Sequence, residues 1–236
     1  MKDRLTRIRE SERNSHIKIY TNEKLYQTDS WLKRPIKTVQ EIVPFFDGYE
    51  KLRVLDLGCG VGRNSIYFAQ QFQTIDCLVE CVDLLDIAIE KLLENAAEYN
   101  VTSNIKGIIN SIEAYKIQND SYDLIMTISA LEHLDTEDSF LQKLLEIRDG
   151  VRKNGIVCLV INSDIAEMCV ETNKSVDSQF EVNLPSETIR NILYEIFYGW
   201  EILKTTVVAQ QYEIPREYYT SRLNTNVITY VARKTI

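Results

Sequence analysis

Residues 52–65 read Leu-Arg-Val-Leu-Asp-Leu-Gly-Cys-Gly-Val-Gly-Arg-Asn-Ser, and the rest of the chain is organised around them. An apolar run ends in glycines at alternate positions, Gly58, Gly60 and Gly62, and a helical pattern follows over residues 64–70. A buried parallel strand that turns sharply into a helix has this pattern. Glycine suits such a turn because it accepts a positive φ and has no side chain to keep a ligand off the backbone.

The spacing of these glycines differs from that of a dinucleotide-binding loop. The dinucleotide fingerprint is G-x-G-x-x-G/A, and counting from Gly58 its third glycine position is occupied by Arg63. Asp56 stands two residues before Gly58, where its carboxylate would repel a pyrophosphate but would suit an ammonium or sulfonium group. The loop therefore disfavours a nicotinamide cofactor. A strand–turn–helix that binds no ligand is the alternative.

The composition favours one α/β domain with additions. The chain has 236 residues, is 44% hydrophobic and carries a net charge of −8. One sizeable core is possible at this length, and an acidic chain without a long basic run disfavours nucleic acid as a partner. No apolar run approaches ~18 residues and the first residues are charged, so we expect no contact with a membrane and a cytoplasmic location. The cysteines match no disulfide scaffold or zinc pattern, so we expect buried thiols and no metal site. They are Cys59, Cys77, Cys81, Cys158 and Cys169.

Strand and helix patterns alternate after the glycine turn. We expect strands at about 77–83, 104–110, 122–129, 156–161, 200–208 and 226–233, and helices at about 87–99, 136–152 and 185–198. Upstream, a helix is expected at about 34–46 with Pro35 in its first turn. Residues 162–185 lack periodicity and are expected to form connections above the sheet. The segment 214–222 looks too long for a tight hairpin.

Two acidic residues near the end of the second strand compete for one role. Asp83 ends that strand about 20 residues after Gly62, where an acidic side chain commonly accepts hydrogen bonds from ribose hydroxyls. Asp86 stands where the N-cap of the following helix would be. We assign ribose binding to Asp83 and helix capping to Asp86.

Residues 56–65 resemble motif I of the class I S-adenosylmethionine-dependent methyltransferases, and their last four residues are similar to the tellurite-resistance-type members. The stretches 122–125 and 131–134 (Tyr-Asp-Leu-Ile and Leu-Glu-His-Leu) also resemble this family. The resemblance covers about residues 50–234. It implies an α/β, Rossmann-like open seven-stranded sheet, mostly parallel, with helices on both faces. The implied strand order is 3-2-1-4-5-7-6 with strand 7 antiparallel. The implied division is a helical arm or lid at 1–48 and a methyltransferase domain at 49–236.

The resemblance implies S-adenosylmethionine as cofactor and S-adenosylhomocysteine as its product. The glycine loop would face the methionyl part, Asp56 its ammonium group, Asp83 the ribose and Ile112 the adenine. Ser111 stands where the family usually has an acid, and a hydroxyl accepts a hydrogen bond more weakly than a carboxylate. The expected cofactor-binding residues are Asp56, Gly58, Cys59, Gly60, Gly62, Asn64, Asp83, Leu84, Ser111, Ile112 and Ile128.

The acceptor is expected to contact three separate segments. Aromatic residues before the first strand would line its pocket if that segment is a lid, or would only anchor the arm. The end of the fourth strand would lie beside the transferring methyl group. An Arg–Tyr cluster before the last strand would suit an anionic or aromatic acceptor, or would be a solvated loop. The expected residues are Tyr20, Tyr26, Trp31, Ser129, Arg216, Tyr218 and Tyr219.

His133 is the candidate catalytic base, because it is one of only two histidines and follows the fourth strand. A histidine that packs or caps in that turn is the alternative, and a base is needed only if the acceptor must lose a proton before attack.

The leading function is methyl transfer from S-adenosylmethionine to a small-molecule acceptor. A non-catalytic protein that binds the cofactor or its product would keep the same motifs. A nicotinamide-dependent oxidoreductase is opposed by Asp56 and Arg63. Neither the acceptor nor the oligomeric state can be predicted.

Overall fold

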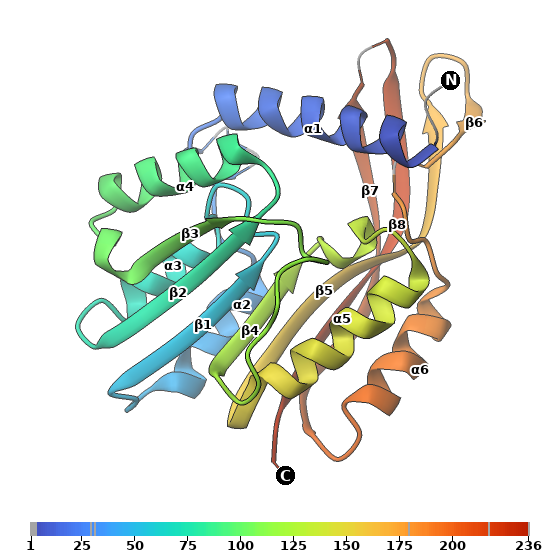
Figure 1. Ribbon diagram of the computed structural model, residues 1–236. Coiled ribbons are helices and arrows are strands. Elements are labelled where there is room, and N and C mark those ends of the chain that lie inside the picture. The colour runs from blue at the N-terminus through green and yellow to red at the C-terminus, as the bar shows by residue number, and fades with distance from the viewer. Residues whose placement is uncertain (1–3, 29, 31, 179, 217, 236) are drawn as a thin grey trace.

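Strand β1 (Lys51–Leu57) lies inside a twisted sheet, and its second half is buried on both faces. The structure is a computed structural model that describes residues 4–28, 30, 32–178, 180–216 and 218–235. The sheet order is β3-β2-β1-β4-β5-β8-β7, with β6 paired to β5 (Figure 1). The other strands are β2 (Asp76–Asp83), β3 (Ile105–Ile109), β4 (Tyr122–Ile128), β5 (Val151–Cys169), β6 (Lys174–Val176), β7 (Glu201–Pro215) and β8 (Thr220–Arg233).

The predicted fold class is confirmed. Strands β1 to β5 pair in parallel, whereas β8 runs antiparallel to both β5 and β7. Because β7 and β8 are the predicted sixth and seventh strands, the observed order equals the predicted 3-2-1-4-5-7-6. The short strand β6 is an addition that the sequence did not predict.

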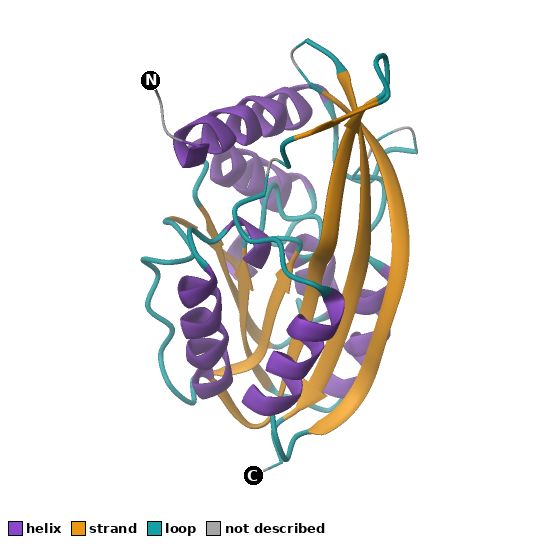
Figure 2. Ribbon diagram, turned by 90° about the vertical axis from the view of Figure 1, so that its right-hand side faces the viewer, coloured by secondary structure: helices purple, strands orange, loops and turns teal. Residues whose placement is uncertain are grey.

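Helices cover both faces of the sheet (Figure 2). Alternate β1 residues point to opposite faces, so Leu52 and Val54 join one core cluster while Leu55 and Leu57 join the other. The first cluster contains side chains of α2 (Lys37–Ile42), α3 (Ser65–Gln71) and α4 (Asp86–Glu98). The second contains side chains of α5 (Glu137–Gly150) and α6 (Ser186–Ile196). Three-residue 3₁₀ turns occur at Thr102–Asn104 (η2) and Leu131–His133 (η3).

The segment before β1 begins with a long helix, α1 (Arg4–Asn22), that lies across α4 (Figure 1). The helix expected at 34–46 is shorter than predicted. The α-helical part is Lys37–Ile42, and a 3₁₀ turn, η1 (Val43–Phe46), continues it. Pro44 stands at the start of that turn and has no N–H to donate to an α-helical bond, which accounts for the change of helix type. Val39 and Phe46 share one core with β1, so this part of the arm is firmly packed.

The far half of the sheet corrects two expectations. Residues 162–176, expected as connections, continue β5 to Cys169 and then form β6. The segment 214–222 is also mostly strand, because β7 and β8 pair up to Pro215 and Thr220 around a short turn. The three long strands therefore rise well beyond the level at which β4 ends (Figure 2). No helix among the described residues is both long and apolar enough to cross a membrane.

Candidate functional site

The three glycines after β1 adopt left-handed backbone angles, with φ of 74° at Gly58, 53° at Gly60 and 87° at Gly62. The expected need for positive φ is therefore met. A Cβ on Gly58 would lie 2.4 Å from the Cβ of Ala130, and one on Gly62 would lie 2.4 Å from Leu92 Cδ1. These two glycines thus allow close packing within the protein. A Cβ on Gly60 would instead lie 2.9 Å from the Tyr20 hydroxyl of α1.

Asp83 lies beside this loop at the carboxyl end of β2. The Gly60 N–H donates to its Oδ2 (2.8 Å), and the Leu85 N–H donates to its Oδ1 (3.0 Å). Burial raises the pKa of the Asp83 carboxyl, although these backbone donors and the nearby His16 act in the opposite direction. A carboxylate has about four acceptor positions. Asp83 therefore retains the capacity to accept bonds from a diol.

Asp56 sits beneath the loop, with its side chain buried. The Ser65 hydroxyl donates to its carboxylate. Burial raises the pKa of Asp56 to about 7, partly offset by the Ser65 bond, and the charge of Asp83 adds to the rise. Any ligand ammonium would therefore interact with a carboxyl that is already held by the protein.

Other predicted cofactor residues lie around the same edge. Cys59 is buried and its N–H donates to Val82 O (3.1 Å). Asn64 accepts the Ile36 N–H (3.1 Å), so its side chain ties the arm to the loop. Leu84 is 58% exposed. The Ser111 hydroxyl accepts the Ala114 N–H (3.1 Å), which leaves its own O–H to donate.

Two apolar residues complete the predicted cofactor edge. Ile112 Cδ1 lies 3.6 Å from the position that a Cβ on Gly58 would take, so its side chain flanks the loop. Ile128 is the last residue of β4 and is half-buried. Asp86, expected as the N-cap of α4, is instead its first residue, and Leu85 is the N-cap. The prediction for Asp86 was therefore wrong by one position.

Comparison with known proteins agrees with this geometry. A family model described as "Methyltransferase domain" matches residues 54–155. The chain is 28% identical over 104 residues to (S)-coclaurine N-methyltransferase of Thalictrum flavum subsp. glaucum, covering 44% of this chain and 27% of that protein. It is 27% identical over 121 residues to a ubiquinone biosynthesis O-methyltransferase of Rickettsia canadensis (strain McKiel), covering 51% and 47%. The chain thus spans less than half the length of these relatives. Residues 54–155 thus match a methyltransferase domain, in agreement with the resemblance to the class I S-adenosylmethionine-dependent methyltransferases.

Among solved structures, TehB from Haemophilus influenzae has the same fold as this chain. The TM-score is 0.61 at 24% identity, over 83% of this chain and 62% of that one.

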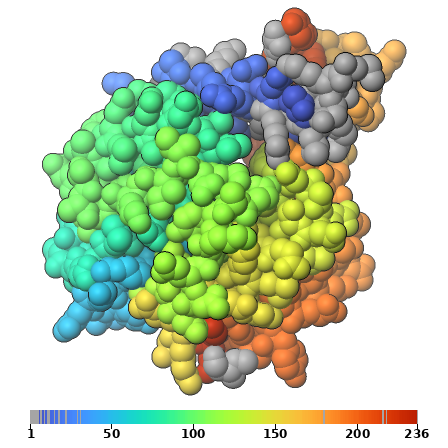
Figure 3. Space-filling view, in the orientation of Figure 1, coloured from blue at the N-terminus to red at the C-terminus, as the bar shows by residue number. Residues whose placement is uncertain are grey.

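Helix α1 lies beyond the carboxyl ends of the parallel strands in Figure 1 and forms part of the top surface of the molecule in Figure 3. Tyr20 faces Gly60, and its ring lies 5.5 Å from the ring of His16. Arg13 reaches Asp86 at 3.6 Å, with both side chains exposed. Tyr20 thus reaches the edge where an acceptor is expected.

Tyr26 is held by contacts at the end of the arm. Its hydroxyl donates to Arg63 O (2.7 Å) and its ring packs against Tyr99 at 5.2 Å. These contacts anchor the end of the arm, which was the alternative considered for this residue. The prediction for Trp31 falls outside the described residues.

His133 ends the η3 turn after β4. Its Nδ1 lies 3.2 Å from Glu181 Oε2, and its ring stacks on Phe180 at 4.9 Å. The Glu181 side chain is only 3% exposed and that of His133 is 28% exposed. The glutamate therefore orients the imidazole while one edge of the ring stays accessible. Ser129, just before this turn, is exposed with φ of 52°.

The predicted Arg–Tyr cluster does not form a single binding surface. Arg216 is 4% exposed, and its Nη2 pairs with Glu167 Oε2 at 3.1 Å. The Ser221 hydroxyl donates to the same carboxylate (2.6 Å). The charge of Arg216 is thus already balanced within the protein, which argues against its predicted role with an anionic acceptor. Tyr218 is 86% exposed, and Tyr219 is half-buried.

Sequence reasoning missed two glutamates near His133. Glu181 has no local pattern that marks it, because its contact with His133 depends on the fold. Glu132 is buried and accepts both the side-chain and backbone N–H of Asn162. Burial raises its pKa, and its Oε2 has no hydrogen-bond partner among the described residues. The quoted stretch 131–134 contained this residue, but nothing there indicated that it is buried.

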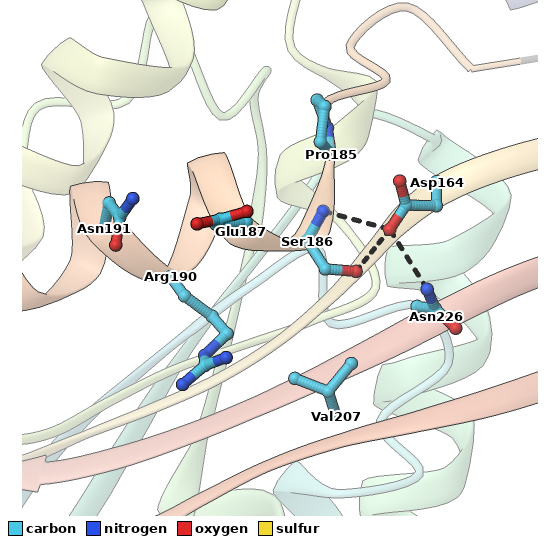
Figure 4. Close-up of a pocket in the computed structure, with 8 residues that line it drawn as sticks. All are labelled: Asp164, Pro185, Ser186, Glu187, Arg190, Asn191, Val207 and Asn226. Carbon is cyan, nitrogen blue, oxygen red and sulfur yellow. Dashed lines mark hydrogen bonds between the residues drawn. The ribbon is translucent and has the colours of Figure 1, made fainter.

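A separate hollow of about 600 Å³ lies between α6 and the strands β5, β7 and β8. Asp164 accepts hydrogen bonds from Ser186 and Asn226 at its rim, while Arg190 and Val207 face it from α6 and β7 (Figure 4). Because it contains none of the glycine-loop residues, we do not assign it to the cofactor.

Proposed function

We propose that this chain transfers the methyl group of S-adenosylmethionine to a small-molecule acceptor. The observation that carries the proposal is the contact between Asp83 and the Gly60 N–H, which joins the acid of β2 to the glycine loop of β1. Relatives named as small-molecule N- and O-methyltransferases support the class of acceptor. The acceptor atom is not part of the proposal.

The residues at the loop fit this cofactor. Asp83 keeps acceptor positions for the two ribose hydroxyls, and Leu84 is exposed next to it. Ile112 flanks Gly58 and supplies an apolar side chain for a flat ring. Asp56 is close enough to the loop to favour an ammonium group, although the Ser65 hydroxyl holds it beneath the backbone. We propose these as the cofactor contacts, with Gly58, Gly60 and Gly62 shaping the turn.

The bound cofactor supplies a methyl group on a sulfonium sulfur, which is a good leaving group. The protein then has to align the acceptor with that methyl group and to exclude water. We propose that residues 1–48 form an arm over the domain at 49–236, with Tyr20 closing the loop. His133, oriented by Glu181, is placed to accept a proton from an acceptor that must lose one.

Calorimetric titration with S-adenosylhomocysteine, with NAD in parallel, tests the cofactor. Asp83→Asn keeps an acceptor for the Gly60 N–H but loses the charge, so we expect at least a tenfold loss of affinity, about 1.4 kcal/mol. Glu90→Gln, at an exposed residue of α4, is the matched control and should bind as the wild type does. Failure of folded wild type to bind the thioether, or preference for NAD, would overturn the proposal.

A protein that binds S-adenosylhomocysteine without catalysing methyl transfer would give the same titration result. Product detection by mass spectrometry with a panel of amine, phenol and thiol acceptors separates the two functions. Methylated product from the wild type that disappears in Asp83→Asn supports catalysis. Binding without product from any acceptor class favours the non-catalytic reading.

A further inference from the structure

The two outer edges of the sheet differ in how they are protected. β3, at one edge, is only five residues long, and its Lys106 pairs with Glu80 at 2.6 Å. Short strands and lysines are the usual means of preventing an edge from pairing with another chain. β7, at the opposite edge, is 15 residues long and pairs with β8 alone among the described strands.

The middle of β7 has none of these protective features. Residues 205–211 read Thr-Thr-Val-Val-Ala-Gln-Gln, without a charge, a proline or a glycine. All seven are exposed, and Val207 and Val208 are 39% and 48% exposed. Threonine and valine favour strands, and a long uncharged edge is a template for a further strand.

Contacts at both ends limit this open stretch. Below it, Lys204 binds Glu41 of α2. Above it, Tyr212 and Ile214 pack against the small core of Ile165, Phe180 and Leu223. The hollow beside Val207 leaves the α6 face of the strand uncovered (Figure 4). The stretch 205–211 is therefore held at both ends by the fold while its outer edge stays accessible.

We propose that β7 pairs antiparallel with β7 of a second copy of this chain, around a two-fold axis at Val208, so that two sheets become one. In this register alone, every residue of 205–211 lies opposite a residue of the same stretch in the second copy. Thr205 then lies opposite Gln211, Thr206 opposite Gln210, and Val208 opposite Val208. No two like charges meet within the stretch, so the segment is complementary to itself.

Oligomeric state is the first test, by light scattering over a roughly hundredfold range of concentration. We expect a dimer. Val208→Lys places two ammonium groups against each other at the axis and should give a monomer. Ile109→Lys on the opposite edge is the matched control, because Ile109 is 59% exposed and should leave the dimer intact. A wild type that is monomeric throughout, or a Val208→Lys variant that stays dimeric, overturns the proposal.

Single introduced cysteines test the register, because the five native cysteines are all buried. Directly opposite residues of antiparallel strands have Cα atoms about 4.5–5.5 Å apart, within the range that a disulfide spans. Val208→Cys should therefore form a covalent dimer under mild oxidation. Thr206→Cys should not, since its counterpart lies four residues away, roughly 13 Å. Mixing Thr206→Cys with Gln210→Cys should restore cross-linking. Equal cross-linking of Val208→Cys and Thr206→Cys would contradict this register.

Discussion

The two halves of the sheet differ in how their strands end at the carboxyl edge. In the β1–β2–β3 half, strands end in tight turns, and the polar groups at the edge are bonded to neighbouring backbone, as Asp83 is to Gly60. In the β5–β8–β7 half, strands continue past the edge, with β5 running from Val160 opposite Ile128 up to Cys169, roughly 30 Å further. The first half is held by glycine turns with positive φ and close contacts. The second is held by side chains, including the buried pair of Arg216 and Glu167.

The largest expected effect on stability is in the β1–β2–β3 half, at Gly58. Gly58→Ala combines a φ of 74° with a Cβ only 2.4 Å from that of Ala130, so we expect a loss of about 4 kcal/mol or more in the free energy of unfolding. Gly48→Ala is the control, because Gly48 has φ of 84° but no atom within 4 Å of the added Cβ. It should cost about 1–2 kcal/mol. Equal losses in urea denaturation would show that packing at Gly58 does not matter.

In the β5–β8–β7 half, the variant to compare with Gly58→Ala is Arg216→Met. It leaves Glu167 buried without its cation, which costs about 3 kcal/mol and should loosen the upper strands first. Hydrogen exchange would then rise in the upper parts of β7 and β8 while β1 stays protected. Arg222→Met in the same hairpin removes an exposed pair with Glu213 and should cost less than about 1 kcal/mol. Uniform loss of protection across the sheet would mean that the two halves unfold as one.

Titration of Asp56 gives a smaller effect. Burial raises its folded-state pKa to about 7, above the unfolded value, so the folded protein holds this proton more tightly. The stabilisation is present below the unfolded pKa and is lost as pH rises through 7. Between pH 5 and 8 the cofactor-free wild type should lose roughly 2 kcal/mol relative to Asp56→Asn.

Thermal melts at several pH values check this prediction. Asp76→Asn is the control, because Asp76 is exposed and its hydrogen bond with Arg53 lowers its pKa, so any trend has the opposite sign. A pH-independent difference between wild type and Asp56→Asn would indicate that Asp56 is not protonated in the fold.

The smallest expected effect is on the rate of ligand dissociation, through Tyr20 of helix α1. Tyr20→Leu removes the hydroxyl over Gly60, so S-adenosylhomocysteine should dissociate roughly fivefold faster, about 1 kcal/mol. Stopped-flow displacement measures the rate. Tyr198→Leu, at a residue that is 84% exposed, should leave it unchanged. A slower rate in Tyr20→Leu would mean that Tyr20 competes with the ligand.

The β1–β2–β3 half could be predicted because the residues that mark its turns stand close to its strands in the sequence. Glycines at 58, 60 and 62 and the acid at 83 each follow a strand within a few residues, so spacing alone placed them at one edge. The extension of β5 beyond Ser163 could not be predicted, because this part of the chain is a strand only through its pairing with β8. The ion pair of Arg216 and the hydroxyl bond of Tyr26 could not be predicted for the same reason. Their partners, Glu167 and Arg63, are distant in sequence, and no local pattern shows whether a side chain is already bonded.

The uneven attachment of α1 has a consequence for turnover. Its carboxyl end is followed by Tyr26 and Leu25, which are bonded to Arg63 and Tyr99, while at its middle the exposed pair of Arg13 and Asp86 holds it. Exposed pairs weaken as salt rises, whereas buried hydrogen bonds do not. We therefore expect higher ionic strength to loosen the middle of this helix and to speed the release of S-adenosylhomocysteine, while the carboxyl end of the helix stays attached.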